Sequence, residues 1–492
     1  MFDSITRILM KKAALFLFLL PSLSFGQSIT WDSPIEVNAN RDFGHTRPKV
    51  VIPKDGSPVI MWGKANNLGV YVSKWNGSDF TSPLKVTPNG VNAFVQSWAG
   101  PGMEALNDDV FVSFKAQPEN AGFVYVVKSS DGGKTFGDTI RVSSNNWSRF
   151  PEVAILPNGN PVVTYMDFDP NFKDPRYVVS VSKDGGTSFQ KAVNASEKAP
   201  GEACDCCPGF IMADSERIII LFRNNDDDLR DIWASISEDG GATFELAKDI
   251  DKSNWMIGGC PSTGAEAIIV DDSLVSTWMS GATGNSMINI GTSNLSDLSV
   301  GMNAEITPGL TNGIQNYPKI AGDKSLLAVT WQEVANSSRN VNLALSVSGP
   351  LGFQKFTPIQ VNINDKGVQQ SPDIAYDGAY LHLVWQDLTA QKLMYRRGKV
   401  DLTASTKPLE KLPYSIYPNP TTSKLSIELS DKNASITDIQ LTDISGRPVD
   451  VKPMLVHNQL SLHLESLVSG FYFISMKING HLFTSRVQLV KP

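Results

Sequence analysis

The chain has 492 residues, of which 41% are hydrophobic and 19% charged, a composition typical of soluble globular proteins with room for more than one domain. Its formal net charge is −7 at pH 7. An acidic chain of this kind argues against a nucleic-acid backbone or an anionic membrane surface as its partner.

The N-terminus has the pattern of a secretory signal peptide. Basic residues precede an apolar run from Ala13 to Leu20, and a small-residue segment follows, with cleavage expected before Gln27. The apolar run is too short to span a bilayer as a helix, and no later segment reaches the required length. The sequence therefore predicts an exported protein with a signal peptide over residues 1–26 and no transmembrane segment.

A proline recurs at the start of an apolar run at intervals of 50 to 57 residues. This spacing suits the four-stranded blades of a β-propeller, and proline is tolerated at the first residue of a strand, which need not donate to the ladder. The sequence predicts an all-β fold with a seven-bladed β-propeller over residues 27–400. The prolines are Pro48, Pro101, Pro151, Pro208, Pro261, Pro318 and Pro372.

The last of these repeats lacks an outermost strand of its own. A strand-like segment, Pro34–Asn38, precedes the first repeat. We expect it to complete the last blade by pairing with Leu393–Lys399, which ties the chain ends together and leaves no open sheet edge.

Three segments of the propeller region, residues 130–136, 183–189 and 238–244, are near-copies of one another. Each connects two alternating apolar runs, so each is expected to be a hairpin turn in which aspartate binds backbone amides and glycine supplies positive φ. They resemble the Asp-box (BNR) turn of the sialidase-like β-propellers, Ser-x-Asp-x-Gly-x-Thr-Trp/Phe. The resemblance implies a propeller; sialidases have six blades, which is the second choice here.

The candidate site residues gather on the face opposite these turns. In a propeller, the loops that lead into the innermost strands and those that join the second and third strands open around one mouth of the central channel. Aromatic and charged groups converging there suit a carbohydrate. The candidates for substrate binding are Arg47, Arg149, Arg223, Trp62, Trp278, Trp331 and Trp385.

Segments 46–48 and 149–151 resemble the Arg-Ile-Pro element of sialidases, whose arginine binds the substrate carboxylate. The resemblance implies that the candidate arginines are carboxylate ligands and that Tyr317, with Glu333, is the nucleophile pair. The family's acid/base aspartate has no counterpart at the expected place. Asp167 or Asp169, opposite Glu333 or Asp387, is an alternative acid and base pair. The chain is thus expected to be an exo-glycosidase for a terminal acidic sugar or a non-catalytic glycan- or protein-binding propeller.

Four cysteines lie in the segments that lead into the fourth and fifth blades. In an exported protein this even number first indicates two disulfides, and a copper or zinc site or free redox-active thiols are the alternatives. The acidic run Asp226, Asp227, Asp228 with Asp231 suits either a calcium ion or a solvated loop. No other cofactor is expected. The cysteines are Cys204, Cys206, Cys207 and Cys260.

The C-terminal region, residues 414–492, follows a linker at 401–413. It has a Tyr417-Pro418-Asn419-Pro420 opening, a Gly446-Arg447 turn, a Gly470-x-Tyr472 strand and a basic, valine-rich ending. These features resemble the type A C-terminal sorting domain of the type IX secretion system of Bacteroidetes. The resemblance implies a small β-sandwich, interaction with the type IX secretion machinery, and export through the periplasm to the surface or medium. An extracellular glycan or glycoprotein is the expected partner there.

Overall fold

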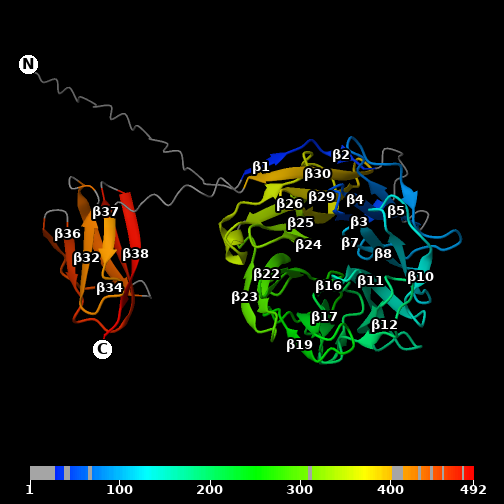
Figure 1. Ribbon diagram of the computed structural model, residues 1–492, viewed down its shortest axis with the longest axis horizontal. Coiled ribbons are helices and arrows are strands. Elements are labelled where there is room, and N and C mark those ends of the chain that lie inside the picture. The colour runs from blue at the N-terminus through cyan, green and yellow to red at the C-terminus, as the bar shows by residue number, and fades with distance from the viewer. Residues whose placement is uncertain are drawn as a thin grey trace, which may run out of the picture. The chain divides into compact units, whose positions relative to one another are not determined.

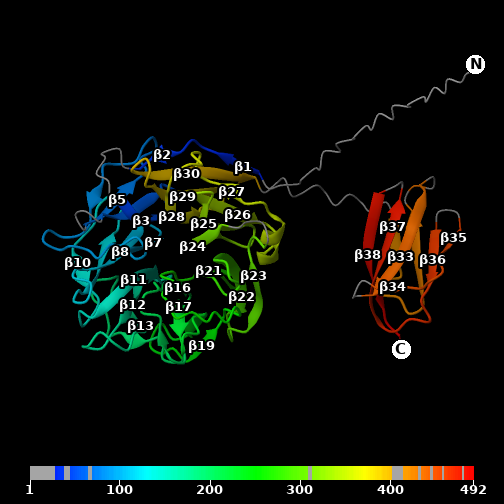
Figure 2. The ribbon, with the colours of Figure 1, turned by 180° about the vertical axis from the view of Figure 1, so that it is seen from behind.

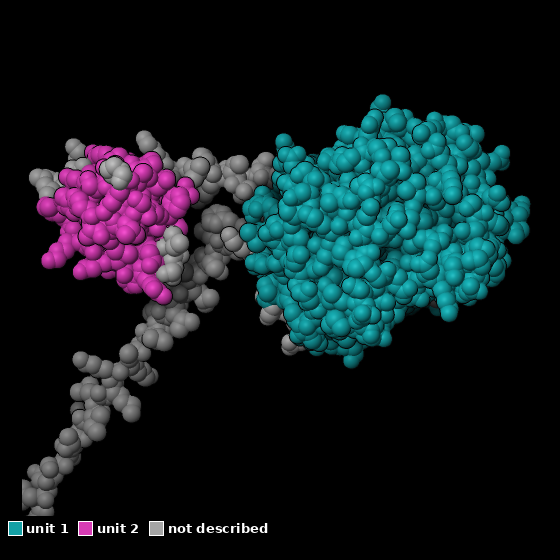
Figure 3. Space-filling model, turned by 90° about the horizontal axis from the view of Figure 1, so that it is seen from below, with its two compact units in different colours: residues 1–402 teal, residues 403–492 magenta. Residues whose placement is uncertain are grey.

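The computed structural model describes residues 28–37, 45–64, 69–308, 313–401, 414–429, 431, 434–443, 447–456, 459–478 and 481–491. The chain divides into two compact units, residues 1–402 and 403–492, which Figure 3 colours separately. The signal peptide predicted over residues 1–26 and the predicted linker after residue 401 lie outside the described residues. No helix within the described ranges is long and apolar enough to cross a membrane.

The described part of the first unit folds into seven antiparallel sheets. The first contains β3 (His45–Val51), β4 (Val59–Lys64), β5 (Gly69–Lys74) and β6 (Leu84–Lys85). The second contains β7 (Gly102–Leu106), β8 (Asp109–Lys115), β9 (Val124–Ser129) and β10 (Thr139–Arg141). The third contains β11 (Ser148–Ile155), β12 (Pro161–Asp167), β13 (Arg176–Val181) and β14 (Val193–Asn194).

The fourth sheet contains β15 (Glu202–Ala203), β16 (Phe210–Asp214), β17 (Arg217–Asn225), β18 (Ile232–Ser237) and β19 (Leu246–Asp249). The fifth contains β20 (Glu266–Val270), β21 (Ser273–Ser280), β22 (Met287–Asn294) and β23 (Val300–Glu305). The sixth contains β24 (Ile314–Gly322), β25 (Leu327–Ala335), β26 (Ser338–Ser346) and β27 (Ile359–Gln360), with a 3₁₀-helix, η1 (Pro350–Lys355), before β27. The seventh contains β28 (Gln369–Tyr376), β29 (Tyr380–Asp387) and β30 (Lys392–Asp401), joined by β1 (Ser28–Trp31) and β2 (Ile35–Glu36).

These sheets stand around a common centre (Figures 1 and 2). The innermost strands β3, β7, β11, β16, β20, β24 and β28 each contact the next, and β28 contacts β3. The first unit is therefore an all-β propeller whose ring is closed by contact between its first and last sheets.

The N-terminal strand completes the last sheet. Ile35 pairs with Tyr395 and Glu36 with Met394 across β2 and β30, which confirms the predicted closure at these two residues, whereas Asn38 lies outside the described residues. A second strand, β1, which was not predicted, extends the same edge by pairing with the end of β30. The chain ends of the unit are thus hydrogen-bonded into one sheet.

Four tryptophans of the second strands are packed between neighbouring sheets. Trp62 of the first sheet shares a core cluster with Val384 and Tyr395 of the seventh, and Trp331 of the sixth shares one with Ile288 of the fifth. Because an indole that is at most 2% exposed has no ring face free to stack on a sugar, the structure assigns these residues to the core and not to a substrate surface. They are Trp62, Trp278, Trp331 and Trp385.

The three repeated hairpin turns share one hydrogen-bonding pattern. In the third sheet, the Asp184 carboxylate accepts hydrogen bonds from the Ser188 amide (2.9 Å), the Ser188 hydroxyl (2.6 Å) and the Ser182 hydroxyl (2.8 Å). Asp131 and Asp239 accept equivalent bonds in the second and fourth sheets. The Ser188 hydroxyl and the other donors lower the pKa of Asp184 to about 2. The polar groups of these turns are therefore used within the turns themselves.

The second unit is a β-sandwich. One sheet contains β31 (Tyr414–Tyr417), β32 (Lys424–Leu429), β36 (Gln459–His463) and β35 (Met454–Val456). The other contains β34 (Pro448–Val449), β33 (Ile436–Asp443), β37 (Gly470–Ile478) and β38 (His481–Leu489). Ile427 and Leu462 of the first sheet share one buried core with Ile474 and Val487 of the second.

Candidate functional site

A bulge recurs at the start of four innermost strands, at the channel end opposite the repeated turns. The pairing register shifts around the proline in β3, β11, β24 and β28, because proline cannot donate to the ladder. The residue before each proline has positive φ: 50° at Arg47, 52° at Phe150, 52° at Tyr317 and 52° at Ser371. Left-handed backbone costs a non-glycine residue about 1 kcal/mol. The packing of the surrounding sheets maintains this left-handed conformation.

The residue after each of these prolines carries a charge. Lys49, Glu152, Lys319 and Asp373 occupy this position in β3, β11, β24 and β28, and Glu266 occupies the matching register position in β20. In β7 the matching residue is Gly102, where a Cβ would lie 2.5 Å from a Glu152 carboxylate oxygen. The channel is therefore lined near this end by charged side chains that the sequence analysis did not identify.

Four of these charges form two ion pairs. The Lys49 Nζ atom lies 3.0 Å from both Glu152 carboxylate oxygens. Lys319 forms an ion pair with Glu266. The Asp373 carboxylate accepts a hydrogen bond of 2.8 Å from the Val50 amide. Removal from water is costly for each group, so the pairs hold one another in the charged state.

Burial determines the direction of most pKa shifts in the channel. It raises the pKa of Asp373 to about 6 and that of Glu104, on β7, to about 7. It lowers the pKa of Lys319. Burial acts in the same direction on Lys49, but the charge and hydrogen bonds of Glu152 overcome it and raise the Lys49 pKa above its ordinary value.

A small pocket, with a cavity volume of about 30 Å³, opens at this end of the channel. Its walls come from the first, third, fourth, fifth and sixth sheets, so it lies on the axis of the ring. The segments that lead into β16 and β20 approach closely, since a Cβ on Gly264 would lie 1.9 Å from the Pro208 carbonyl oxygen. The lining residues are Arg47, Glu152, Pro208, Gly209, Ser262, Thr263, Gly264, Ala265, Glu266, Tyr317, Pro318 and Lys319.

Two predicted site residues meet in this pocket. The Arg47 guanidinium carbon lies 5.1 Å from the centre of the Tyr317 ring, within the range of a cation–π interaction. Among the described residues, no carboxylate forms an ion pair with Arg47. Arg47 is half-buried, and Lys49 and Lys319 are paired with carboxylates, so the charge of Arg47 is available to a ligand.

The other two predicted arginines have different surroundings. Arg223 is fully buried, and its guanidinium donates to the backbone carbonyls of Thr263, Arg230 and Met279 at 3.3, 2.6 and 2.8 Å. These bonds join the fourth and fifth sheets, so Arg223 has a structural place. Arg149 forms an ion pair with Glu119 at 2.9 Å. Its guanidinium also stacks on Phe172.

The predicted carboxylates also have protein partners. One oxygen of Glu333 accepts hydrogen bonds from Gln315 (3.0 Å), Trp331 (3.1 Å) and Asn342 (3.1 Å). Asp167 accepts a hydrogen bond from Asn145 and forms an ion pair with Arg176 at 3.3 Å. Neither carboxylate lines the channel-mouth pocket. The carboxylates that do line it, those of Glu152 and Glu266, were missed.

One of the two disulfides expected among the four cysteines is present. Cys206 and Cys260 form a disulfide between the segments leading into the fourth and fifth sheets. The second expected disulfide is absent: within the described chain, Cys204 and Cys207 are buried thiols. Cys204, Cys206 and Cys207 are the one group of potential ligands in the described ranges whose atoms are close enough to hold a metal ion.

The acidic run considered for calcium does not form one cluster. Asp227 and Asp228 are exposed, whereas Asp231 is buried and accepts a hydrogen bond of 2.8 Å from the Trp255 amide. Burial raises the pKa of Asp231 to about 7. Its carboxylate is thus bound by the segment between β19 and β20.

Residues 415–490 match the family described as the secretion system C-terminal sorting domain. This match confirms the predicted sorting domain of the type IX secretion system, which directs the protein to the cell surface or the extracellular space. No curated protein matches the chain.

Several solved structures resemble the propeller. A protein from Dyadobacter fermentans, described as of unknown function, has 11% identity and a TM-score of 0.44, covering 76% of this chain and 99% of its own. A polysaccharide lyase described as an ulvan lyase has 10% identity and a TM-score of 0.49, covering 74% and 95%. A Hadza microbial sialidase has 11% identity and a TM-score of 0.39, covering 72% and 66%. At these identities the likeness concerns the fold alone.

Proposed function

We propose that this secreted propeller binds an acidic sugar of an extracellular glycan in the channel-mouth pocket, with Arg47 as the ligand of the sugar carboxylate. The observation that carries the proposal is the pairing pattern. Lys49 and Lys319 are neutralised by Glu152 and Glu266, whereas Arg47 lies over the Tyr317 ring and, among the described residues, forms no ion pair with a carboxylate.

Guanidinium chemistry suits such a ligand. Arginine binds a carboxylate through two parallel hydrogen bonds, which fix orientation as well as position. The stacking of Arg47 on Tyr317 holds the guanidinium plane before a ligand arrives, so less conformational entropy is lost on binding. Glu152 and Glu266 offer carboxylate oxygens to sugar hydroxyls in the same pocket. The three repeated turns, which resemble Asp-boxes, lie at the opposite end and are not part of this site.

Binding assays test the proposal. We expect glycans ending in sialic or uronic acids to bind, and their neutral counterparts to bind at least tenfold more weakly. Arg47→Ala should reduce affinity for the acidic glycans by at least tenfold, about 1.5–3 kcal/mol, because a charge-assisted contact is lost. The matched control is Arg217→Ala, which removes an arginine paired with Asp214 at the turn between β16 and β17, away from the pocket. Equal binding of neutral glycans, or unchanged binding by Arg47→Ala, would contradict the proposal.

Hydrolysis of the terminal sugar by a retaining mechanism is a second candidate. It is favoured by one observation, that Tyr317 lines the same pocket as the carboxylates of Glu152 and Glu266. If Tyr317 is the nucleophile, Tyr317→Phe should abolish release of a fluorogenic leaving group from sialosides and leave binding nearly unchanged, because only the covalent step is lost. Binding without turnover by the wild-type protein would select the non-catalytic function. If the wild-type protein neither binds nor cleaves these glycans, a protein becomes the next candidate ligand.

A further inference from the structure

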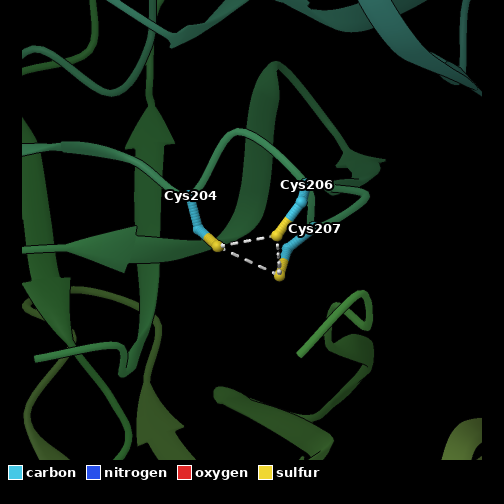
Figure 4. Close-up of side chains that lie close together, drawn as sticks. All are labelled: Cys204, Cys206 and Cys207. Carbon is cyan, nitrogen blue, oxygen red and sulfur yellow. Dashed lines mark hydrogen bonds between the residues drawn. The ribbon is translucent and has the colours of Figure 1, made fainter. Parts of the chain in front are cut away.

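The segment between β15 and β16 brings three cysteine sulfurs together, directly before the pocket-lining residues Pro208 and Gly209. Figure 4 shows the side chains of Cys204, Cys206 and Cys207 converging. The Cys204 sulfur lies 3.2 Å from that of Cys207 and 3.5 Å from that of Cys206. Cys206 is already bonded to Cys260 on the neighbouring segment. Two thiols therefore lie directly behind a disulfide.

The two thiols differ in pKa. The hydrogen bond shared with Cys207 and the charge of Arg230, whose Nη1 atom is 3.1 Å from the Cys204 sulfur, lower the pKa of Cys204 below its ordinary value against the opposing effect of burial. Burial raises the pKa of Cys207 well above its ordinary value. Of the two thiols, Cys204 therefore loses its proton more readily, and its sulfur lies 3.5 Å from the Cys206 sulfur of the disulfide. Thiolates, not thiols, attack disulfides.

The cysteines also differ in exposure. Cys204 and Cys207 are buried, with relative exposures of 1% and 0%, whereas Cys260 is exposed. An external reagent can therefore reach Cys260 far more readily than the two thiols behind it.

We propose that these four cysteines form a thiol–disulfide exchange site, in which the Cys204 thiolate attacks the Cys206 sulfur and Cys260 is the leaving thiolate. The Cys206–Cys260 bond breaks and a Cys204–Cys206 bond forms. The bonding electron pair leaves on the Cys260 sulfur, which takes a proton from water when the pH is below its pKa. No oxidant or reductant is consumed.

The exchange moves a reactive thiol from the interior to the surface. There it meets its substrate class, an external disulfide on a small molecule or peptide. The Cys260 thiolate attacks one of its sulfurs, forms a mixed disulfide and releases the other half as a thiolate. The exchange also replaces a link between two segments by a link within one. Because Gly209 and Ser262, which line the pocket, follow these cysteines closely, the link between two walls of the pocket is lost.

Trapping with iodoacetamide tests the exchange on the full mature chain, purified without reductant. After timed labelling between pH 5 and 8, the protein is denatured, the remaining thiols receive an isotopically heavy label, and non-reduced peptides are mapped by mass spectrometry. We expect light label on Cys260 together with a Cys204–Cys206 disulfide, formed faster as the pH rises and more of the Cys204 thiol is deprotonated. An intact Cys206–Cys260 disulfide, with Cys204 and Cys207 carrying only heavy label, would overturn the proposal.

Variants separate the chemistry from effects on folding. Cys204→Ser should lower the labelling of Cys260 at least tenfold, whereas Cys207→Ala should retain it with a pH midpoint at least one unit higher, because the hydrogen bond to the thiolate is lost. Arg230→Gln should also raise the midpoint, and Arg230→Lys should restore it in part. Equal labelling in Cys204→Ser would contradict the proposal. Four free thiols with stoichiometric zinc or copper in the purified protein would overturn it in favour of a metal site. Glycan binding does not enter these readouts, so the test is independent of the proposed function.

Discussion

At the end of the propeller that carries the hairpin turns, the same residues recur: Asp131, Asp184 and Asp239 each accept hydrogen bonds from their own turn. At the opposite end, four innermost strands share one bulged backbone, but the left-handed residue before proline changes from Arg47 to Phe150, Tyr317 and Ser371. The same residue types recur in the turns, where the backbone conformation requires them. The residue types differ at the bulges, where side chains can face a pocket. The comparison teaches that repetition in this chain marks structure and that variation on a repeated backbone marks the site.

The comparison is tested most strongly by two arginines with contrasting surroundings. Arg223→Met should lower the free energy of unfolding by about 4 kcal/mol, because three backbone carbonyls lose a buried charged donor. Arg47→Met, in the pocket, should change it by less than about 1 kcal/mol. Urea denaturation followed by tryptophan fluorescence measures both. Equal effects of the two substitutions would remove the distinction between a structural arginine and a ligand-binding one.

Loss of an ion pair in the channel is expected to have the next largest effect on stability. Lys49→Met should destabilise the propeller by about 2 kcal/mol, because the Glu152 carboxylate 3.0 Å away is left unpaired in a largely buried place. The double variant Lys49→Met with Glu152→Leu should recover most of this loss, since both charges are then absent. A double-mutant cycle of unfolding free energies measures the coupling. Additive losses would show that the two residues do not act as a pair.

The hairpin turns give the smallest effect. Asp239→Ala should cost about 1 kcal/mol at pH 7, comparable to the loss of a helix N-cap, because the Thr243 amide and hydroxyl lose their acceptor. The Thr243 amide and the other donors lower the pKa of Asp239 to about 2. Its ordinary pKa is about 4. The folded carboxylate thus contributes stability above about pH 4 that is lost as the pH falls toward 2. Unfolding curves of both proteins from pH 7 to 2 should converge. A difference independent of pH would contradict this assignment.

Local chemistry explains which parts of the molecule could be predicted. The hairpin turns depend on aspartate, glycine and hydroxyl residues within seven positions. The starts of the innermost strands are marked by proline. Both features can therefore be predicted from the sequence. The sorting domain was predictable for the same reason, because its opening, turn and final strand each carry a short pattern that residues 415–490 share with a family.

The site was harder to predict because it depends on closure of the ring. Lys49 and Glu152 are 103 positions apart and become partners only when the sheets surround the channel. The sequence does not show whether Arg223 or Arg47 faces the channel mouth, because the start of an innermost strand and the end of a second strand are expected at the same end of the ring. The same ambiguity placed Trp62 and its counterparts at the surface, where the structure has them in the core. The number of cysteines did not determine their bonding either. Four cysteines are compatible with two disulfides and also with one disulfide and two free thiols.

The most direct test of the central claim is a crystal structure of the propeller with an oligosaccharide that ends in sialic or glucuronic acid. We expect the sugar carboxylate to lie within hydrogen-bond distance of the Arg47 guanidinium, in the pocket that Tyr317 and Lys319 help to line. A sugar bound on another face, or one whose carboxylate points away from Arg47, would contradict it.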